Sequence, residues 1–136
     1  MKLSDIEDAV LFVSSSMYGE NSAMLCKSTG EICWSSDTSD IDDIPEEAYE
    51  SDDWIEIPHK NDLDLGRDLV FDFIAQNLPS EQDRVYHIFR RRGAYNRYKN
   101  FLEEKGLLQK WYNYENEQTS KAIKEWCQEN NITLTA

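Results

Sequence analysis

Apolar residues recur at helical spacing through the second half of this chain, and proline or glycine interrupts the pattern at intervals. From position 61 onward, apolar residues three or four apart form stripes, which predict a series of amphipathic helices. The first of these helices begins at Asn61 or Asp62, and its stripe consists of Leu65, Leu69, Val70, Phe73 and Ile74. Pro79 ends it, and Gly93 and Gly106 end the next two helices, since glycine readily takes the left-handed position after a helix.

Three further helices are expected in this half. Ser80 begins one that runs to Gly93, residues 94–105 form the next, and the last runs from about Leu107 to Asn130 and Asn131. Residues 61–136 are therefore predicted to be a mainly helical body.

The first sixty residues follow a different pattern. Ser4 and Glu7 have the spacing of a capping box, and the apolar residues after them predict a helix over about 4–17, with the stripe Ile6, Ala9, Val10, Val13 and Met17. Residues 22–36 predict a β-hairpin about the turn KSTGE, and the alternation in residues 54–57 predicts a third strand that returns to it. We therefore expect an α+β fold, with a small antiparallel sheet (hairpin plus one strand) packed on the helical C-terminal body.

The hairpin turn fixes the expected positions of two cysteines. If Gly30 closes a three-residue loop in the left-handed conformation, Cys26 faces Ile32 and Leu25 faces Cys33. The thiols of Cys26 and Cys33 then point to opposite faces of the sheet, and both are expected to stay reduced. In this register a single apolar face carries Met24, Cys26, Ile32 and Trp34. Cys127 is expected to be a thiol in the core of the last helix.

Length and composition agree with one domain, residues 1–136, in which 1–60 form the acidic helix-plus-hairpin part and 61–136 the helical part. Apolar residues make up 40% of the chain, and no run approaches the roughly 20 apolar residues of a membrane span. The N-terminus MKLSDIEDAV carries acids where a signal peptide would be apolar. We expect a soluble cytoplasmic protein with no membrane partner.

Charge is distributed very unevenly along the chain, whose formal net charge is -13. Residues 37–53 contain nine acids and no base, which predicts a solvated loop with a short helix after Pro45. The acidic surface expected from this run consists of Asp40, Asp42, Asp43, Glu46, Glu47, Asp52 and Asp53. In contrast, residues 84–110 contain eight Lys or Arg and two Glu.

The cationic stretch provides the leading candidate site. Its members are Arg90, Arg91, Arg92, Tyr95, Arg97, Tyr98 and Lys99. On a helix, three consecutive arginines spread over about 200° of the circumference, so at least one should face solvent or a ligand. Two readings remain open: the arginines pair with the protein's own carboxylates, or they bind phosphate or an acidic protein. The two tyrosines are expected to be exposed and able to stack on bases.

Two helices joined at Gly93 also have the outline of a helix-turn-helix DNA reader, although the turn is shorter than usual. This outline keeps nucleic acid among the possible partners.

Other clusters favour structural roles. Asp64, Asp68 and Asp72 have the spacing of one helix side and offer oxygen ligands for a hard cation, but Arg67 lies among them and a solvated stripe is favoured. His59 and His87 are isolated, and the four tryptophans fall in apolar faces. We therefore predict no catalytic residue, no metal and no cofactor.

The stretches LDLGRDLVFDF (63–73), VYHIFRRRGAYNRYKNFLEEKGLLQKWY (85–112) and EWCQENNI (125–132) resemble a bacterial family known as uncharacterised protein family 0158. The resemblance includes the TGE turn and the WIEIP strand and runs over nearly the whole length. Tyr98 stands where the family usually has Phe, and Asn131 where it tends to have Gly. The resemblance implies an intact bacterial cytosolic domain, and it transfers no catalytic residue because the family has no established activity.

Two functions of different classes follow from these patterns. The leading one is a non-enzymatic binding or regulatory module whose cationic surface engages a polyanion or an acidic protein. The alternative is an acidic decoy or inhibitor that occupies a basic nucleic-acid-binding protein through residues 37–53. A small hydrolase that uses the aspartates at 64, 68 and 72 is a third, weaker interpretation. The partner, protein or nucleic acid, is not named by the sequence.

Overall fold

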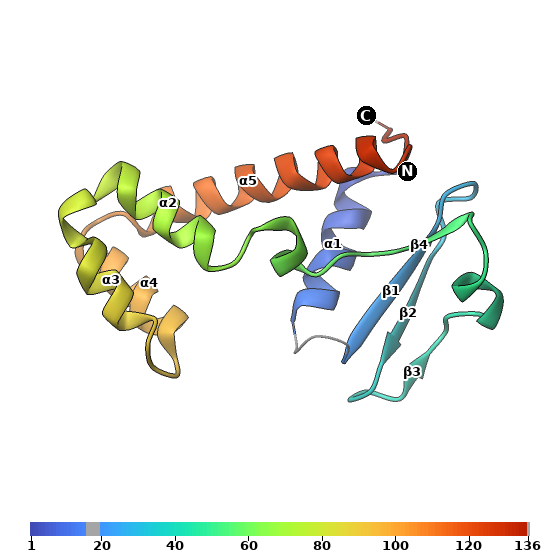
Figure 1. Ribbon diagram of the computed structural model, residues 1–136, viewed down its shortest axis with the longest axis horizontal. Coiled ribbons are helices and arrows are strands. Elements are labelled where there is room, and N and C mark those ends of the chain that lie inside the picture. The colour runs from blue at the N-terminus through green and yellow to red at the C-terminus, as the bar shows by residue number, and fades with distance from the viewer. Residues whose placement is uncertain (16–19, 136) are drawn as a thin grey trace. The chain divides into compact units, whose positions relative to one another are not determined.

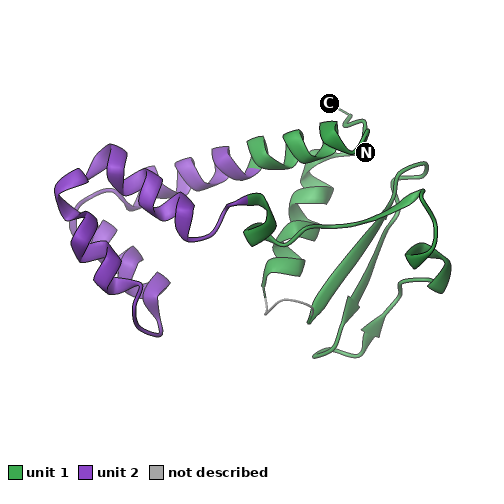
Figure 2. Ribbon diagram, viewed as in Figure 1, with its two compact units in different colours: residues 1–63, 120–136 green, residues 64–119 purple. Residues whose placement is uncertain are grey.

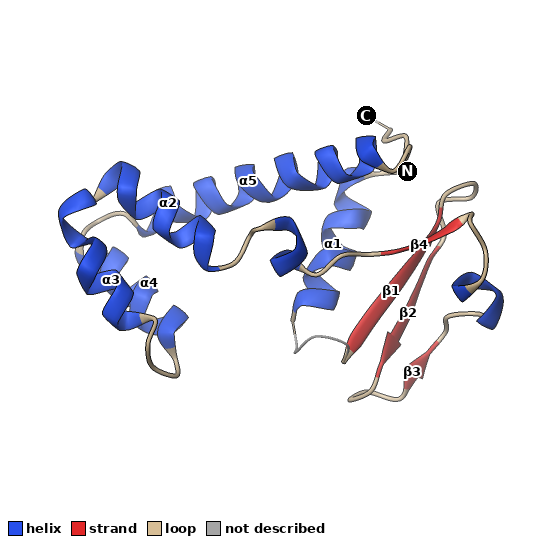
Figure 3. Ribbon diagram, viewed as in Figure 1, coloured by secondary structure: helices blue, strands red, loops and turns tan. Residues whose placement is uncertain are grey.

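The strands lie in the first half of the chain and most of the helices in the second, so the predicted α+β class is confirmed (Figures 1 and 3). The computed structural model describes residues 1–15 and 20–135. Contacts divide the chain into two compact units, which Figure 2 shows in different colours. Unit 1 consists of Met1–Leu63 with Ser120–Ala136, and unit 2 of Asp64–Thr119. The division at residue 63 is close to the one expected at residue 60, and the last part of the chain groups with unit 1.

Unit 1 is built on an antiparallel sheet with the strand order β3-β2-β1-β4. The strands are β1 Asn21–Cys26, β2 Ile32–Ser36, β3 Ile41–Asp42 and β4 Trp54–Glu56. The third strand expected at 54–57 is present as β4 and pairs with β1, as the sequence predicted. The short strand β3 pairs with the other side of β2, within the segment expected to be a loop. The short 3-10 helix η1, Glu46–Tyr49, follows Pro45 as predicted.

Apolar side chains cover both faces of this sheet. On one face, the helix α1, Leu3–Ser14, packs through Ile6, Ala9 and Val10 into a cluster with Ala23 and Leu25. The last part of α5, Leu108–Glu129, adds Ile123 and Cys127 to this cluster. On the other face, a smaller cluster consists of Met24, Cys33, Ile44 and Ala48, with Trp54 packed against it. The acidic segment is therefore anchored to the sheet by its two buried apolar residues.

The predicted register of the hairpin is wrong by one residue. Met24 pairs with Cys33 and Leu25 with Ile32, and the loop has four residues because the N–H of Cys26 donates to the carbonyl of Glu31 at 2.8 Å. Gly30 has the left-handed φ of 78° that was expected, and its N–H donates to the carbonyl of Cys26 at 2.8 Å. Cys26 and Cys33 consequently share one face of the sheet instead of opposite faces. Both remain buried free thiols, as does Cys127.

The start of α1 also differs from the prediction. The residue before the helix is Lys2, which makes no capping side-chain hydrogen bond and instead forms a parallel bridge with Thr135. Ser4 thus lies inside the first turn, and the expected capping box is not formed. The carboxylate of Glu7 accepts a hydrogen bond from the hydroxyl of Ser120 at 3.1 Å. Met17, assigned to this helix from the sequence, lies outside the described residues.

Unit 2 consists of α2 Arg67–Asn77, α3 Gln82–Ile88, α4 Ala94–Glu104 and the first part of α5. The 3-10 helix η3, Pro79–Glu81, leads directly into α3. Side chains from all four helices form one core, which contains Leu69, Val70, Phe73, Ile74, Val85, Phe89, Tyr98, Phe101, Leu102 and Trp111. The stripe predicted from Leu69 to Ile74 is therefore the buried face of α2. The expected ends of α4 and α5 agree with the structure to within a residue or two.

The predicted start of α2 at Asn61 or Asp62 is wrong. Residues Lys60–Leu63 form the 3-10 helix η2, where the carboxylate of Asp62 accepts the backbone N–H of His59 at 3.2 Å. Asp64 then takes a left-handed φ of 57°, and α2 begins only after Gly66. Asp64 is therefore not on the helix that carries Asp68 and Asp72, and the expected stripe of three aspartates does not exist.

Within residues 1–15 and 20–135, none of the helices is both long and apolar enough to cross a membrane.

Candidate anion-binding site

The helices α3 and α4 form an antiparallel hairpin within unit 2. Near the start of α3, an Arg84 Nη lies 4.0 Å from Oε2 of Glu104, the last residue of α4. At the opposite end of the hairpin, the rings of Phe89 and Tyr95 meet edge to face with centroids 5.1 Å apart. Gly93 makes the tight turn possible because it adopts a φ of 71°, a conformation that is costly for residues with a Cβ.

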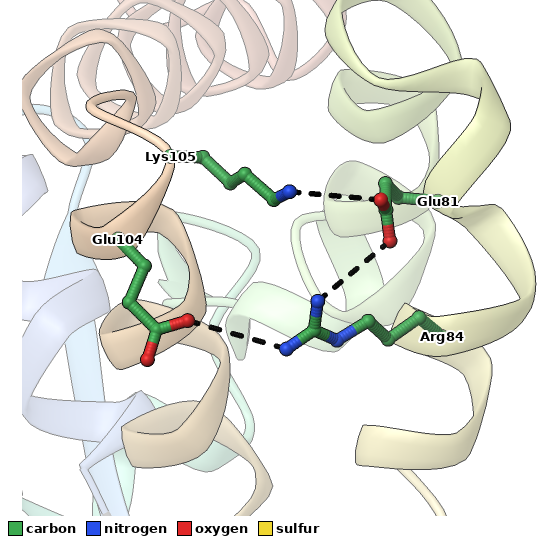
Figure 4. Close-up of polar contacts among 4 residues, drawn as sticks. All are labelled: Glu81, Arg84, Glu104 and Lys105. Carbon is green, nitrogen blue, oxygen red and sulfur yellow. Dashed lines mark ion pairs between the residues drawn. The ribbon is translucent and has the colours of Figure 1, made fainter.

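Ion pairs hold the two helices together at the end away from the turn (Figure 4). Glu81 is shared, since Arg84 lies 4.0 Å and Lys105 3.6 Å from its two carboxylate oxygens. The guanidinium of Arg84 also lies over the ring of Phe101, 4.8 Å from its centroid. The Arg84 side chain is 54% exposed and that of Lys105 36%, so each pair contributes little to stability. Their combined effect is to restrict where the Arg84 guanidinium points.

The three consecutive arginines lie in the turn between the helices, which corrects the expectation that they lie on a helix. The helix α3 ends at Ile88 because Phe89 turns into the core, where it also packs edge to face on Tyr98. Arg90, Arg91 and Arg92 follow in the loop and are exposed. Among the residues that the structure describes, no ion pair involves any of the three. The internal pairing that the sequence left open is therefore not seen for them.

The other two cations of the site are partly engaged. Nη2 of Arg97 donates a hydrogen bond to the carbonyl of Ile88 at 3.3 Å and so places a positive charge at the C-terminal end of α3. The ammonium of Lys99 lies 5.9 Å from the centroid of the Tyr112 ring. Arg97 is exposed and Lys99 half-buried, so Arg97 remains able to contact a ligand.

An open depression joins these groups on the surface of unit 2. Its volume is about 530 Å³, and it is lined by Arg84, His87, Ile88, Arg90, Arg91 and Arg97. This volume lies within the range of known ligand pockets. Two of its arginines, Arg84 and Arg97, are held by protein contacts, and two come from the loop. The site predicted from the sequence included Arg90, Arg91 and Arg97 but not Arg84, His87 and Ile88. The available signal was the spacing of three and four residues that places His87 and Ile88 beside Arg84 on a helix.

The tyrosines of the candidate site are not exposed stackers. Tyr98 is 0% exposed, and burial raises the pKa of its hydroxyl, with Glu115 adding to the effect. Tyr95 is half-buried against Phe89. Burial and then Glu115 raise the pKa of Tyr95, while the positive charge of Arg67 acts in the opposite direction. Both tyrosines therefore support the hairpin from inside, and the prediction that Tyr98 stacks on a ligand is wrong.

The expected acidic surface in unit 1 is exposed throughout. It comprises Asp40, Asp42, Asp43, Glu46, Glu47, Asp52 and Asp53. Asp53 differs from the others because its carboxylate accepts hydrogen bonds from Ser28 and Cys26, which lower its pKa. It thereby ties the hairpin loop to the start of β4. The rest of this surface carries charge without a described ion-pair partner.

The two units differ in formal net charge. Unit 1 contains eighteen Asp or Glu and five Lys or Arg, which gives a formal net charge of -13. Unit 2 contains nine acids and nine bases and is formally neutral. The whole net charge of the protein therefore belongs to the sheet unit, whereas the depression lies in the neutral unit.

The described residues contain no cluster of potential metal ligands. Across residues 1–15 and 20–135, no group of three or more His, Cys, Asp or Glu side chains is arranged to hold a metal ion. His59 is buried beside a smaller depression of unit 1, and its Nδ1 accepts the N–H of Asn61 at 3.1 Å. His87 lies in the wall of the arginine-lined depression.

These features define an α+β protein with an acidic sheet unit and a helical unit that bears an arginine-lined depression. The chain belongs to the uncharacterised protein family UPF0158, which matches residues 19–136, and the resemblance seen in the sequence is thereby confirmed. No curated protein and no solved structure matches the chain with significance.

Proposed function

We propose that this protein is a non-enzymatic binding or regulatory module that engages a polyanion or an acidic protein through the arginine-lined depression at the α3–α4 turn. The observation that carries the proposal is the loop of Arg90, Arg91 and Arg92, which are exposed and have no described ion pair. Free guanidinium groups present donors in a rigid fork that matches carboxylate and phosphate.

The arrangement reduces the cost of binding. Binding an anion requires flexible side chains to become ordered, at about 0.5–1.5 kcal/mol for each. Arg84 and Arg97 are already restrained by Glu81, Glu104 and the Ile88 carbonyl. A ligand in the depression therefore orders mainly the loop arginines.

The hairpin geometry argues against a helix-turn-helix mode of DNA reading. That motif crosses its two helices at roughly 90–120° and inserts the second into the major groove. Here α3 and α4 are antiparallel, and Arg84 meets Glu104 at the far end from the turn. The proposed contact is made by the turn and the depression instead of by an inserted helix.

The proposal assigns no chemical step to the site. In the described lining of the depression, His87 has only arginines and Ile88 as neighbours, and no Ser, Cys or carboxylate that would act with it as a nucleophile or a base. The cytoplasm is the proposed compartment, supported by three buried free thiols.

A second candidate function rests on the charge of unit 1. Because this unit alone carries the net charge of -13, its exposed acids create a field that attracts a basic partner. An acidic decoy that occupies a basic nucleic-acid-binding protein would use this surface and leave the arginines free.

The proposal is tested by affinity capture from a bacterial cytosol, with and without nuclease, on the immobilised protein. We expect the Arg90→Gln, Arg91→Gln, Arg92→Gln triple variant to lose the partner that the wild type retains, because the free guanidinium groups are removed. A matched control is the Lys110→Gln, Lys121→Gln, Lys124→Gln variant, which removes the same charge from exposed positions on α5.

Equal retention by the wild type and the arginine variant would refute the proposal. Loss of the partner only when Asp40, Asp42, Asp43, Glu46 and Glu47 are neutralised would establish the decoy function instead.

A further inference from the structure

We infer that the anion bound at the α3–α4 turn is the sugar–phosphate backbone of a nucleic acid, contacted without reading of the bases. This inference rests on the proposed function and narrows its ligand to one class. It is carried by the composition of the depression, by the placement of the neighbouring aromatic rings and by the position of the free arginines.

In the types of its residues, the lining of the depression resembles a nucleic-acid interface more than a protein interface. Interfaces between proteins have an apolar centre surrounded by a polar rim, and they are enriched in aromatic residues and Arg and depleted of Lys, Asp and Glu. Interfaces with nucleic acids are more polar and much more positively charged. Four of the six lining residues are arginines, a fifth is His87, and the one apolar member, Ile88, is half-buried. None of the six lining residues is aromatic, and Ile88 is the one apolar side chain among them that a protein partner could bury.

The aromatic rings close to the arginines are unavailable for stacking on bases. Tyr98 is in the core, and Tyr95 packs edge to face on Phe89. Tyr86 is 59% exposed, but it packs against Phe71 of α2 at a centroid distance of 5.2 Å. It lies about 200° around α3 from Arg84 and about 100° from His87, and it is not among the residues that line the depression. Sequence-tolerant stacking, which many single-strand binders use, is therefore not offered beside the depression.

The loop arginines suit contact with phosphates. They lie in a tight turn at the end of a helical hairpin, next to the restrained Arg84 and Arg97. Contacts of arginine to phosphate oxygens fix the position of a nucleic acid and carry no direct sequence information. The expected ligand is therefore any strand whose backbone reaches the depression, with similar affinity for different base sequences.

The test measures binding by fluorescence anisotropy with three labelled probes: a 20-nucleotide oligouridylate, a 20-base-pair DNA duplex and a 20-residue polyglutamate. We expect an oligonucleotide to bind more tightly than polyglutamate, and an oligoadenylate to bind like the oligouridylate. For the arginine triple variant we expect binding at least about tenfold weaker, which corresponds to about 1.4 kcal/mol. The slope of log K against log salt should fall by about 0.7 for each single-strand phosphate contact removed, hence by about 2.

The control variant Lys110→Gln, Lys121→Gln, Lys124→Gln should keep most of the affinity and of the salt slope. Circular dichroism and thermal melting establish that both variants are folded. If polyglutamate binds in an arginine-dependent manner and no oligonucleotide does, this inference is overturned and the proposed function stands.

Absence of binding to all three probes at low salt would overturn both statements. A strong preference for one base sequence would overturn the claim that bases are not read.

Discussion

At the scale of single residues, two polar atoms in the core of unit 2 have no hydrogen-bond partner among the described residues. They are the hydroxyl oxygen of Tyr98 and Nε1 of Trp111, both with almost no solvent exposure. The two rings pack edge to face with centroids 5.1 Å apart, so their apolar atoms are well placed. A buried polar group without a partner loses its hydration, which costs about 1–3 kcal/mol. The apolar packing of unit 2 thus outweighs a local electrostatic penalty.

Replacement of Tyr98 by Phe should therefore stabilise the protein. The substitution keeps the ring and removes the unpaired hydroxyl, and we expect the free energy of unfolding to rise by about 1 kcal/mol. Urea denaturation followed by circular dichroism measures the change. Tyr86→Phe is the control, because the Tyr86 side chain is exposed and its hydroxyl is expected to contribute little. A loss of stability in Tyr98→Phe would mean that the hydroxyl has a bonded partner in solution.

At the scale of the element, the hairpin shows how a turn decides which residues are buried. The sequence indicates a three-residue loop closed by Gly30, whereas the observed loop has four residues. The extra residue shifts the register by one and places Leu25 and Ile32 on the face covered by α1. Asp53 stabilises this loop from β4 through its bonds to Ser28 and Cys26, a contact between residues far apart in sequence.

The hairpin register seen in the structure and the one expected from the sequence predict different effects of replacing Leu25. Leu25 is 0% exposed in the cluster with Ile6 and Ala9, so Leu25→Ala should lower the free energy of unfolding by about 2–5 kcal/mol. In the register expected from the sequence, Leu25 lies opposite the single apolar face and its loss would be mild. Leu11→Ala is the matched control, since Leu11 is 70% exposed on α1 and should change stability by less than about 0.5 kcal/mol. Equal effects of the two substitutions would contradict the observed register.

At the scale of the whole molecule, charge is the main property that separates the two units. Unit 1 holds the entire net charge of -13, and its exposed acids repel one another, which destabilises the compact state. Salt screens such repulsion over about 8–10 Å at moderate ionic strength. The three described ion pairs lie in unit 2, and all their side chains are at least partly exposed, so screening by salt lowers stability little there.

We therefore expect added sodium chloride to raise the melting temperature of the protein. A gain of about 1 kcal/mol would correspond to roughly 3–5 °C for a chain of this size. A variant with Asp40, Asp42, Asp43 and Asp52 changed to Asn and Glu46 and Glu47 changed to Gln should melt higher at low salt and gain less from added salt. Asp53 is kept in this variant because its hydrogen bonds to Ser28 and Cys26 hold the hairpin loop. A melting temperature that falls with salt in both proteins would show that attraction, not repulsion, dominates unit 1.

The sequence by itself determined the features that depend on neighbours in the chain. Apolar spacing gave the buried face of α2 and the extents of α4 and α5, and alternation gave β4. Gly30, Gly93 and Gly106 were placed correctly at positive φ, because a turn or helix end there is specified by the local residue type. The α+β class follows from these local signals together.

Only the tertiary structure decided which side chains the two units bury and which they leave free. The early end of α3 depends on Phe89 packing against Tyr95 and Tyr98, which moves the arginines from a helix into a turn. The same packing removes Tyr98 from the surface. Burial of this kind depends on residues that are distant in sequence and compete for one core, and a periodic pattern records only that a residue is apolar, not what covers it. For this reason the sequence located the cations, while the fold determined that a depression lies between them.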